Sequence, residues 1–101
     1  MDERIYQKKI INKIKDRFPE ALIQKQDSRL HAGIPDLLII YKNRWAMLEV
    51  KKSKQASHQP GQDEKIREFN EWGFASFIFP ENENLVLQKL FDYLEGSANG
   101  D

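Results

Sequence analysis

Two short charged motifs interrupt apolar parts of the sequence. The first, Gly33-Ile34-Pro35-Asp36, runs into the apolar segment 37–41, and the second, Glu49-Val50-Lys51, follows the apolar segment 45–48. A polar break at 42–44 separates the two segments. Short apolar runs with β-branched and aromatic residues are typical of strands. We therefore expect two adjacent antiparallel strands that carry the three charged side chains.

The length of the connection decides which residues lie opposite one another. A two-residue turn at Asn43-Arg44, or a four-residue loop, places Asp36 opposite Lys51 and Leu38 opposite Glu49. Opposite residues share a face of a sheet, and faces alternate along each strand. All three charged side chains then share a face, with Asp36 the diagonal neighbour of Glu49 at roughly 7–8 Å between backbones. A loop with an odd number of residues and no bulge would place these side chains on different faces of the sheet.

Asp36 and Glu49 would form a carboxylate pair in a partly apolar setting. Such a pair repels and loses hydration, so either one group takes up a proton or a divalent cation lies between them. Mg²⁺ suits two carboxylates, because water and phosphate oxygens fill the rest of its octahedral shell. A zinc site is disfavoured, because the chain has no cysteine and His31 and His58 lie far apart in sequence.

Lys51 would stand on the same face as the carboxylate pair. Its charge would hold or deprotonate an attacking water and stabilise a developing pentavalent phosphate. The simpler interpretation is an exposed ladder of charges on a half-buried sheet, which is favoured for an isolated Glu-x-Lys. The residues Gly33 to Asp36 reverse that preference, since Pro is tolerated at the start of a strand and Gly lets the backbone approach a ligand. We expect metal-dependent phosphodiester hydrolysis.

The length and composition indicate one domain. With 40% hydrophobic residues, 101 residues are enough for a single core, and we expect a domain over 1–95 and a small polar tail over 96–101. No apolar stretch approaches the ~20 residues of a membrane span, and the start of the sequence is charged rather than typical of a signal peptide. We expect a soluble, cytoplasmic protein, and the absence of cysteine fits a reducing compartment.

The net charge of zero hides a strong polarity along the chain. Residues 1–60 carry 13 Lys and Arg against 7 Asp and Glu, whereas residues 61–101 carry 3 against 9. Both motifs lie in the basic half, which is suited to neutralising phosphates. A solvated helix face is the alternative for the run from Lys8 to Arg17, and simple exposure is the alternative for His31. The candidate nucleic-acid contacts are Lys8, Lys25, Arg29, His31, Lys52 and Lys54.

Hydrophobic periodicity and breaking residues predict the order α-β-β-β-α-β-α. Pro19, Pro60 and Pro80 fall between the expected elements, and Gly73 stands where a helix C-terminal glycine is expected. An apolar stripe in the last helix predicts a core or subunit contact. The expected elements are a helix at 3–18, a strand at 21–26, the two motif strands, a helix at 61–72, a strand at 74–79 and a helix at 83–95.

Two helices turn polar at the beginning of their buried stripes. The stripe marked by Ile10 and Ile14 leads back to Gln7 and Glu3, and the stripe of the middle helix leads back to Gln62. A Glu that favours the helix dipole, or a solvated Gln, would explain each residue alone. Taken together with the strand carboxylates, these positions predict that Glu3 lies near the metal. They also predict that Gln62 holds either the scissile phosphate or the catalytic lysine.

This ordered set of motifs resembles the VRR-NUC domain of the PD-(D/E)xK nuclease superfamily, in its stand-alone phage and bacterial type. The matching residues are Glu3 with Gln7, Gly33 to Asp36, Glu49 to Lys51, and Gln62 eleven residues before Gly73. The resemblance covers nearly all of residues 1–95. One departure is Gln59, which stands three residues ahead of Gln62 where such domains usually have Ser or Thr.

The resemblance implies an α/β fold with a restriction-endonuclease-like core, in which helices flank a mixed four-stranded sheet. It implies Mg²⁺ or Mn²⁺ held by Asp36, Glu49 and the Val50 carbonyl with help from Glu3, and Lys51 as the catalytic lysine. It also implies a homodimeric endonuclease selective for branched DNA such as four-way (Holliday) junctions, in the cytoplasm of a bacterial cell and in some cases phage-encoded. Two alternatives remain open: a catalytically inactive DNA-binding module of the same fold, and a structural domain whose oppositely charged halves pair between molecules.

Overall fold

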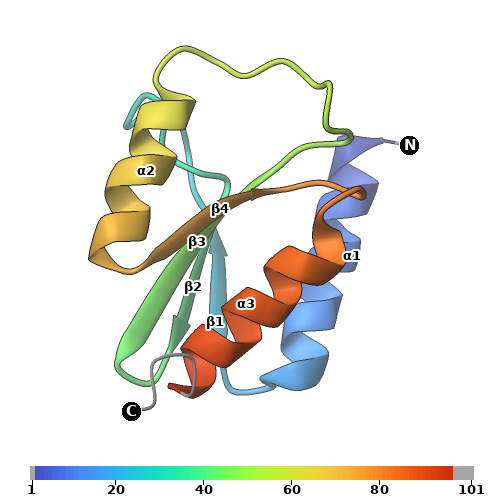
Figure 1. The fold of residues 1–101 in the computed structure, drawn as a ribbon, viewed down its shortest axis with the longest axis vertical. Coiled ribbons are helices and arrows are strands. Elements are labelled where there is room, and N and C mark those ends of the chain that lie inside the picture. The colour runs from blue at the N-terminus through green and yellow to red at the C-terminus, as the bar shows by residue number, and fades with distance from the viewer. Residues whose placement is uncertain (1, 97–101) are drawn as a thin grey trace.

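The computed structural model describes residues 2–96 and has helices on both faces of one sheet (Figure 1). The expected element order is confirmed, although most of the expected tail, residues 97–101, lies outside the described residues. None of the helices in the described range is both long and apolar enough to cross a membrane. The elements are α1 (Glu3–Arg17), β1 (Leu22–Lys25), β2 (Leu37–Tyr41), β3 (Arg44–Val50), α2 (Gln62–Trp72), β4 (Phe74–Ile78) and α3 (Glu83–Glu95).

The sheet is mixed and four-stranded, as expected, with its strands in sequence order. β1, β2 and β3 are antiparallel neighbours, whereas β4 pairs with β3 in parallel after the crossover through α2. Figure 1 shows α1 and α3 together on one side of the sheet and α2 on the other. The hydrophobic core lies under α1 and α3, because alternate residues of β2 and β3 such as Leu37, Ile39, Leu48 and Val50 are fully buried there.

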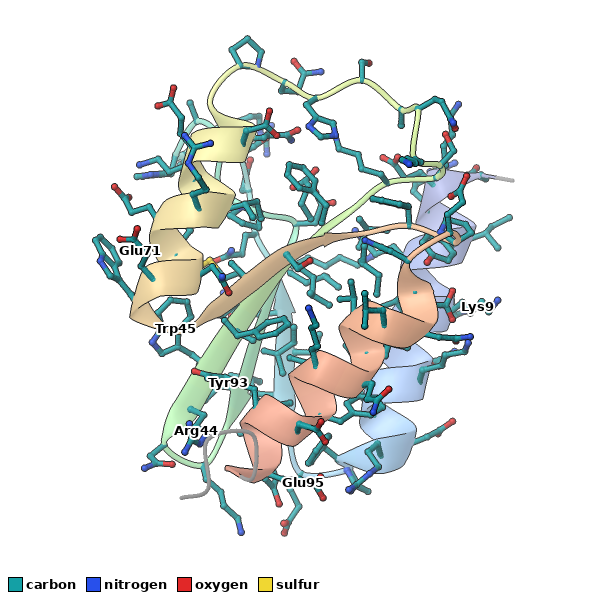
Figure 2. All side chains as sticks on the ribbon, viewed as in Figure 1. Lys9, Arg44, Trp45, Glu71, Tyr93 and Glu95 are labelled. Carbon is teal, nitrogen blue, oxygen red and sulfur yellow. The ribbon has the colours of Figure 1, made fainter. Side chains whose placement is uncertain are left out.

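The apolar stripe of α3 packs into the hydrophobic core of the molecule. Leu87, Leu90 and Leu94 belong to the core, which decides between the core and subunit interpretations of this stripe for the described residues. At its C-terminal end the Tyr93 hydroxyl donates to the carbonyl oxygen of Trp45 at 2.8 Å, and Figure 2 shows the two side chains near each other. α3 is thereby fastened to β3.

The register of the β2–β3 hairpin differs from the prediction by two residues. The turn is Lys42-Asn43 rather than Asn43-Arg44, so Tyr41 pairs with Arg44 and Leu37 with Leu48. Lys42 adopts a left-handed backbone (φ 57°), a conformation that turn rules assign to Gly, Asn or Asp. The error is an even number of residues, so the predicted faces hold, but the opposite partners change.

Gly73 ends α2 for a reason other than a left-handed cap. Its backbone is extended (φ −157°), and a Cβ atom there would lie 2.8 Å from the Trp45 ring. The predicted C-terminal glycine is therefore required by the close approach of a large side chain. The Trp45 ring in turn packs edge-on against Phe69 at 6.3 Å between centroids, which seats α2 on the sheet.

A buried polar network joins α1 to α3. Tyr6 is fully buried and its hydroxyl donates to Glu83 Oε1 at 3.0 Å, while Lys13 pairs with the other carboxylate oxygen. Although burial opposes it, the hydrogen bonds from Lys13 and Tyr6 lower the pKa of Glu83. A second ion pair, Arg17 with Glu95, joins the same helices. Charges of the basic and acidic halves thus pair within the molecule at these two positions.

Replacing Tyr6 with Phe tests this network without changing the packed volume. The substitution removes one hydrogen bond to a buried carboxylate, so we expect the free energy of unfolding to fall by about 2 kcal/mol. Urea unfolding at neutral pH measures the change. Tyr41→Phe is the control, because the Tyr41 hydroxyl makes no hydrogen bond to the described residues, and it should alter stability by less than about 0.5 kcal/mol. Equal effects of the two variants would rule the network out as a source of stability.

Candidate active site

A row of side chains crosses the sheet on the face that carries α2. Lys25 pairs with Leu37 and Leu37 with Leu48, so one further residue places Gln26, Asp36 and Glu49 side by side, and Glu49 pairs with Phe77 of β4. The Gln26 N–H donates to the Asp36 carbonyl oxygen at 2.7 Å, which continues the pairing. Neighbouring positions in such a row are ~4.8 Å apart between backbones. Asp36 is therefore the direct rather than the diagonal partner of Glu49.

Backbone and side-chain donors hold the two carboxylates in place. The Asp36 N–H donates to Glu49 Oε1 at 3.1 Å, and the Val50 N–H donates to Asp36 Oδ2 at 2.9 Å. The side-chain amide of Gln62 donates to Glu49 Oε2 at 3.0 Å. Each carboxylate is thus oriented by the strand of the other, because both lie where β2 begins and β3 ends.

Lys51 completes the group. Its Nζ lies 3.5 Å from Glu49 Oε2 and donates to the Ser57 carbonyl oxygen at 3.1 Å. Its backbone N–H donates to the Ile78 carbonyl oxygen at 2.9 Å, so β4 fixes the position of the residue beyond the end of β3. Glu49 and Lys51 are only 4% and 6% exposed. The predicted grouping of Asp36, Glu49 and Lys51 on one face is what the structure contains.

The two carboxyl groups resist ionising together. Burial raises the pKa of Glu49 to about 7, and the negative charge of Asp36 adds to the shift. Burial also raises the pKa of Asp36, against the hydrogen bond from the Val50 N–H, and the charge of Glu3 raises it further. The attraction of Lys51 offsets part of both shifts. The site therefore favours a shared proton or an added positive charge.

Gln62 reaches the site because α2 begins there. It is buried, as its place on the helix stripe indicates, and its amide donates a hydrogen bond to Glu49 rather than contacting Lys51. The Gln59 N–H donates to Gln62 Oε1 at 2.9 Å, and the Gln62 N–H donates back to the Gln59 carbonyl oxygen at 3.2 Å. This reciprocal pair starts the helix without the hydroxyl side chain that such domains usually have, and Gly61 supplies the left-handed N-cap (φ 87°).

Residues 52–61, which we call the strap, cross the site between β3 and α2. Distant carboxylates hold its backbone: Glu3 Oε2 accepts the Lys52 N–H at 3.0 Å, and Glu81 Oε1 accepts the Lys54 N–H at 3.2 Å. The His58 ring stacks on Phe77 with centroids 4.2 Å apart. Sequence patterns did not reveal these contacts, because each joins residues far apart in the chain through a side chain.

A cavity of about 500 Å³, the site cavity, lies between the strap and the start of α1. Lys51 and Ser57 line it together with Glu3 and Lys52. Its complete lining is Asp2, Glu3, Lys51, Lys52, Ala56, Ser57 and Gln59.

The donor chemistry at Asp36 and Glu49 suits a hard divalent cation. Two carboxyl groups with raised pKa values, one buried and one half-buried, gain from a cation between them, and oxygen donors are the ligands that Mg²⁺ and Mn²⁺ prefer. Within residues 2–96, however, no three His, Cys, Asp or Glu side chains come together as a metal-holding group. The Glu3 carboxylate instead accepts the Lys52 N–H, so the described residues bring together two of the three expected carboxylates.

All six candidate nucleic-acid contacts are exposed. Lys52 borders the site cavity, and Lys25 and His31 line a second cavity on the β1 side of the carboxylate pair. Arg29 forms a fork with Asp27, and Lys54 belongs to the strap. Lys8 is exposed on α1. Four of the six thus belong to the two loops that flank the carboxylate pair, Lys25 ends β1, and the role of all six stays a prediction.

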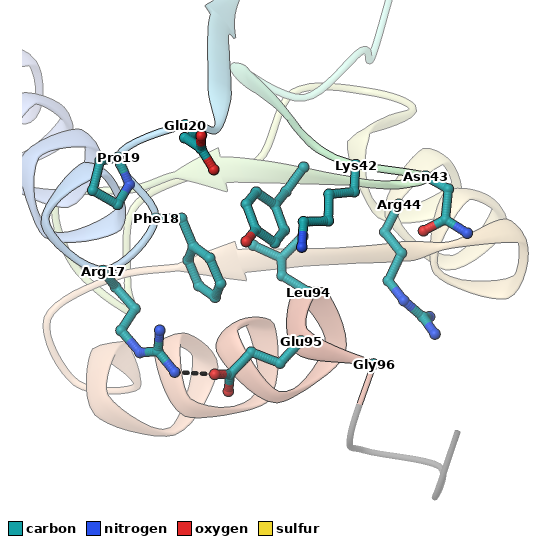
Figure 3. A pocket seen from close by; sticks show the side chains of 11 residues that line it. Arg17, Phe18, Pro19, Glu20, Lys42, Asn43, Arg44, Leu94, Glu95 and Gly96 are labelled. Carbon is teal, nitrogen blue, oxygen red and sulfur yellow. Dashed lines mark hydrogen bonds and ion pairs between the residues drawn. The ribbon is translucent and has the colours of Figure 1, made fainter.

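A cavity of about 520 Å³ lies at the opposite end of the hairpin, by the Lys42-Asn43 turn (Figure 3). Its Arg17 pairs with Glu95, and Lys42 lies over the Tyr41 ring at 5.3 Å. α1 and α3 both end there, and helix C-termini favour nearby cations, which accounts for the basic residues. This cavity contains no residue of the carboxylate row.

Comparison with known proteins supports the fold. No family model and no curated protein sequence matches this chain. A solved structure described as "VRR_NUC domain protein" superposes with a TM-score of 0.65 and 21% sequence identity, over 94% of this chain and 89% of that chain. The chain therefore has the VRR-NUC fold, and the α/β architecture expected from the resemblance is confirmed.

The raised pKa of Glu49 predicts how the metal-free protein responds to pH. A carboxyl whose pKa moves from 4.5 to about 7 on folding stabilises the protein below about pH 4.5, and that contribution is lost as the pH rises to about 7. We expect a loss on the order of 2–3 kcal/mol of unfolding free energy between pH 5 and pH 8. Urea unfolding in EDTA measures it. Glu49→Gln, which cannot ionise, should remove most of this dependence; an unchanged pH profile in that variant would contradict the assignment.

Proposed function

We propose that the protein is a metal-dependent endonuclease that hydrolyses DNA phosphodiester bonds. The observation that carries the proposal is the grouping of the half-buried Asp36 with the buried Glu49 and Lys51 at the meeting point of β2 and β3, beside an open cavity. A nuclease needs acidic ligands, a cation for the transition state and an opening for a phosphate in one place. The VRR-NUC fold and the exposed basic residues on both flanking loops support the same function.

Asp36 and Glu49 would hold Mg²⁺, or Mn²⁺ in its place, with the Val50 carbonyl as a third ligand by resemblance. When bound, the ion supplies Lewis-acid polarisation of the phosphate and a water of lowered pKa. The Val50 N–H holds Asp36 Oδ2, while the Asp36 N–H and the Gln62 amide each hold one oxygen of Glu49. Gln62 thereby acts as a positioning residue for Glu49.

Lys51 provides the positive charge that the reaction needs. Its side chain is buried beside Glu49 and borders the site cavity, and burial strengthens the action of its charge on a phosphate oxygen. Lys51 Nζ donates a hydrogen bond to the Ser57 carbonyl oxygen, and a phosphate oxygen would replace that acceptor when substrate enters. β4 keeps the backbone of Lys51 in place during the exchange.

The proposal extends to branched DNA, such as a four-way junction, and to a homodimer. Each chain has one Asp36–Glu49 pair, and symmetric cutting of a junction requires two. The apolar stripe of α3 is buried within the molecule. The candidate contact between subunits is therefore the outer face of the β2–β3 hairpin, where Ile40 is exposed beside Leu22 of β1. Light scattering during gel filtration measures the mass; a monomer at micromolar concentration would remove the dimer from the proposal.

A second candidate function is that of an inactive DNA-binding module with a nuclease fold. The observation in its favour is that the site residues already make hydrogen bonds within the protein. Lys51 donates to the strap, Glu49 accepts from Gln62, and Glu3 accepts from the Lys52 N–H. DNA binding without cleavage in either metal would support this module.

Side-by-side cleavage assays test the leading proposal. Four-way junction, flap, linear duplex and single-stranded DNA are incubated with Mg²⁺, Mn²⁺ or EDTA. We expect metal-dependent cutting that is fastest on the junction, abolished by Glu49→Ala, and slowed by about 10²–10³-fold by Lys51→Ala, because one transition-state charge is removed. Lys89→Ala, an exposed lysine of α3 outside the site, should cut at the wild-type rate. Cleavage that persists in EDTA would exclude the metal-dependent mechanism.

Two substitutions of Glu3 separate its possible roles. Glu3→Gln keeps an oxygen that can accept the Lys52 N–H but removes the charge near Asp36, so we expect unchanged stability and a severalfold higher Mg²⁺ requirement for cleavage. Glu3→Ala should show the same Mg²⁺ effect and also loosen the strap, with faster hydrogen exchange of the Lys52 amide. A Gln variant with the wild-type metal requirement would restrict Glu3 to holding the strap.

A further inference from the structure

The loop between β1 and β2, residues 26–36, is held firmly at both its base and its tip. At the base the Gln26 side chain donates to the Pro35 carbonyl oxygen at 3.0 Å. At the tip Asp27 Oδ1 accepts the Arg29 N–H at 2.9 Å, and the Arg29 guanidinium forms a fork with the same carboxylate. The loop is therefore ordered by its own polar groups at base and tip, together with the fully buried Pro35 near its base.

Leu30 projects from the tip of this loop into solvent. It is 87% exposed, more than any other large hydrophobic residue described. Exposed leucines are common singly and need no explanation by themselves. Here, however, Leu30 also lines a cavity of about 380 Å³ with the half-buried Ile34, so the apolar side chain forms one wall of a hollow.

The other walls of this hollow, the loop cavity, are polar, and they include Asp27, whose carboxylate is paired with Arg29. Gln24 and Gln26 of the β1 segment offer amide groups, which can both donate and accept hydrogen bonds, and His31 offers an imidazole. Lys25 adds a positive charge. The volume is within the range of about 300–1,000 Å³ found for small-molecule sites. An apolar wall with amide edges and a cation nearby matches a flat heterocycle attached to a phosphate.

The loop cavity lies directly beside the carboxylate pair. Gln26, which lines it, is the sheet neighbour of Asp36 in the row, at ~4.8 Å between backbones. On the α2 side, Gly33 has a positive φ (82°) and a Cβ there would lie 3.0 Å from the Gly61 carbonyl oxygen, so the loop packs closely against the start of α2. The loop cavity and the Asp36–Glu49 site thus share a wall.

We propose that the loop cavity receives an unpaired nucleobase of the DNA substrate, with Leu30 packing on the face of the base. The proposal rests on the proposed nuclease function and deepens it, since it states what the enzyme recognises next to the bond that it cuts. An apolar side chain placed against an unstacked base replaces part of its lost stacking. Gln24, Gln26 and His31 face the edges of the base, and Lys25 lies where the attached phosphate can be neutralised.

The inference explains how branched DNA is preferred over continuous duplex. In a duplex, moving a base into the cavity costs a few kcal/mol of lost stacking and pairing, and this cost is smallest for a base that is already unpaired. Flaps offer such bases, and in a fully paired four-way junction the base pairs at the branch point are the ones that open at the lowest cost. Preference for them then requires no reading of sequence, because the amide groups suit several base edges.

The test uses binding to DNA that carries the fluorescent base 2-aminopurine. The probe is a three-way junction with one unpaired 2-aminopurine at the branch, compared with a linear duplex in which the same base is paired. Protein with Glu49→Ala, which is expected to bind DNA without cutting it, is the parent for this test. We expect its binding to change the fluorescence of the unpaired base, and we expect the added Leu30→Ala to remove most of that change and weaken junction binding by about 10-fold. Leu30→Phe should retain both effects.

Several controls separate the outcomes. Leu85→Ala removes a leucine of α3 that is 57% exposed, and it should bind both probes as the parent does. Leu30→Ala should melt at the parent temperature and bind the linear duplex within about twofold of the parent. Equal loss on both probes, or no loss on the junction, would overturn the inference while metal-dependent cleavage by wild type still supports the nuclease. If wild type neither binds nor cuts any DNA, both proposals fail.

Discussion

The structure depends on two acidic groups that the fold forces together. The two-residue turn at Lys42-Asn43 places Asp36 directly opposite Glu49, on a face that α2 and the strap remove from water. Burial and mutual repulsion make it unfavourable for both carboxyl groups to be ionised at once, so the pKa values of both Asp36 and Glu49 rise. The backbone N–H groups, the Gln62 amide and Lys51 all supply partial or full positive charge to this one point. A divalent cation is the remaining partner that this arrangement favours.

Much of this arrangement is visible in the sequence, because alternation along strands depends only on whether the loop length is even or odd. Asp36, Glu49 and Lys51 share a face under the predicted register and under the observed one. The direct pairing was missed because Lys42 adopts a backbone that turn rules reserve for other residues. The burial of Gln62 followed correctly from stepping back one turn along the stripe of α2. The length of α3 and its core stripe were also predictable from periodicity.

The rest was hidden because it depends on long-range contacts between side chains and backbone. Glu3 and Glu81 hold the strap from elements 49 and 27 residues away. Stepping back from Ile10 by three residues pointed to Gln7, whereas a step of four leads to Tyr6, which is the buried residue and pairs with Glu83. The periodic signal was present, and the choice between three and four residues was wrong. The loop cavity beside Gln26 has no sequence signature, since its walls come from a turn whose shape the Asp27–Arg29 fork sets.

The central claim is that Asp36 and Glu49 together bind a divalent cation in place of a proton. Calorimetric titration of Mn²⁺ at pH 6.5, repeated in buffers of different ionisation enthalpy, counts the protons released on binding. Because the pKa of Glu49 is raised to about 7, we expect wild type to bind Mn²⁺ and release roughly one proton, and Glu49→Gln to lose both effects. Binding that releases no proton and survives in Glu49→Gln would place the metal elsewhere and contradict the account.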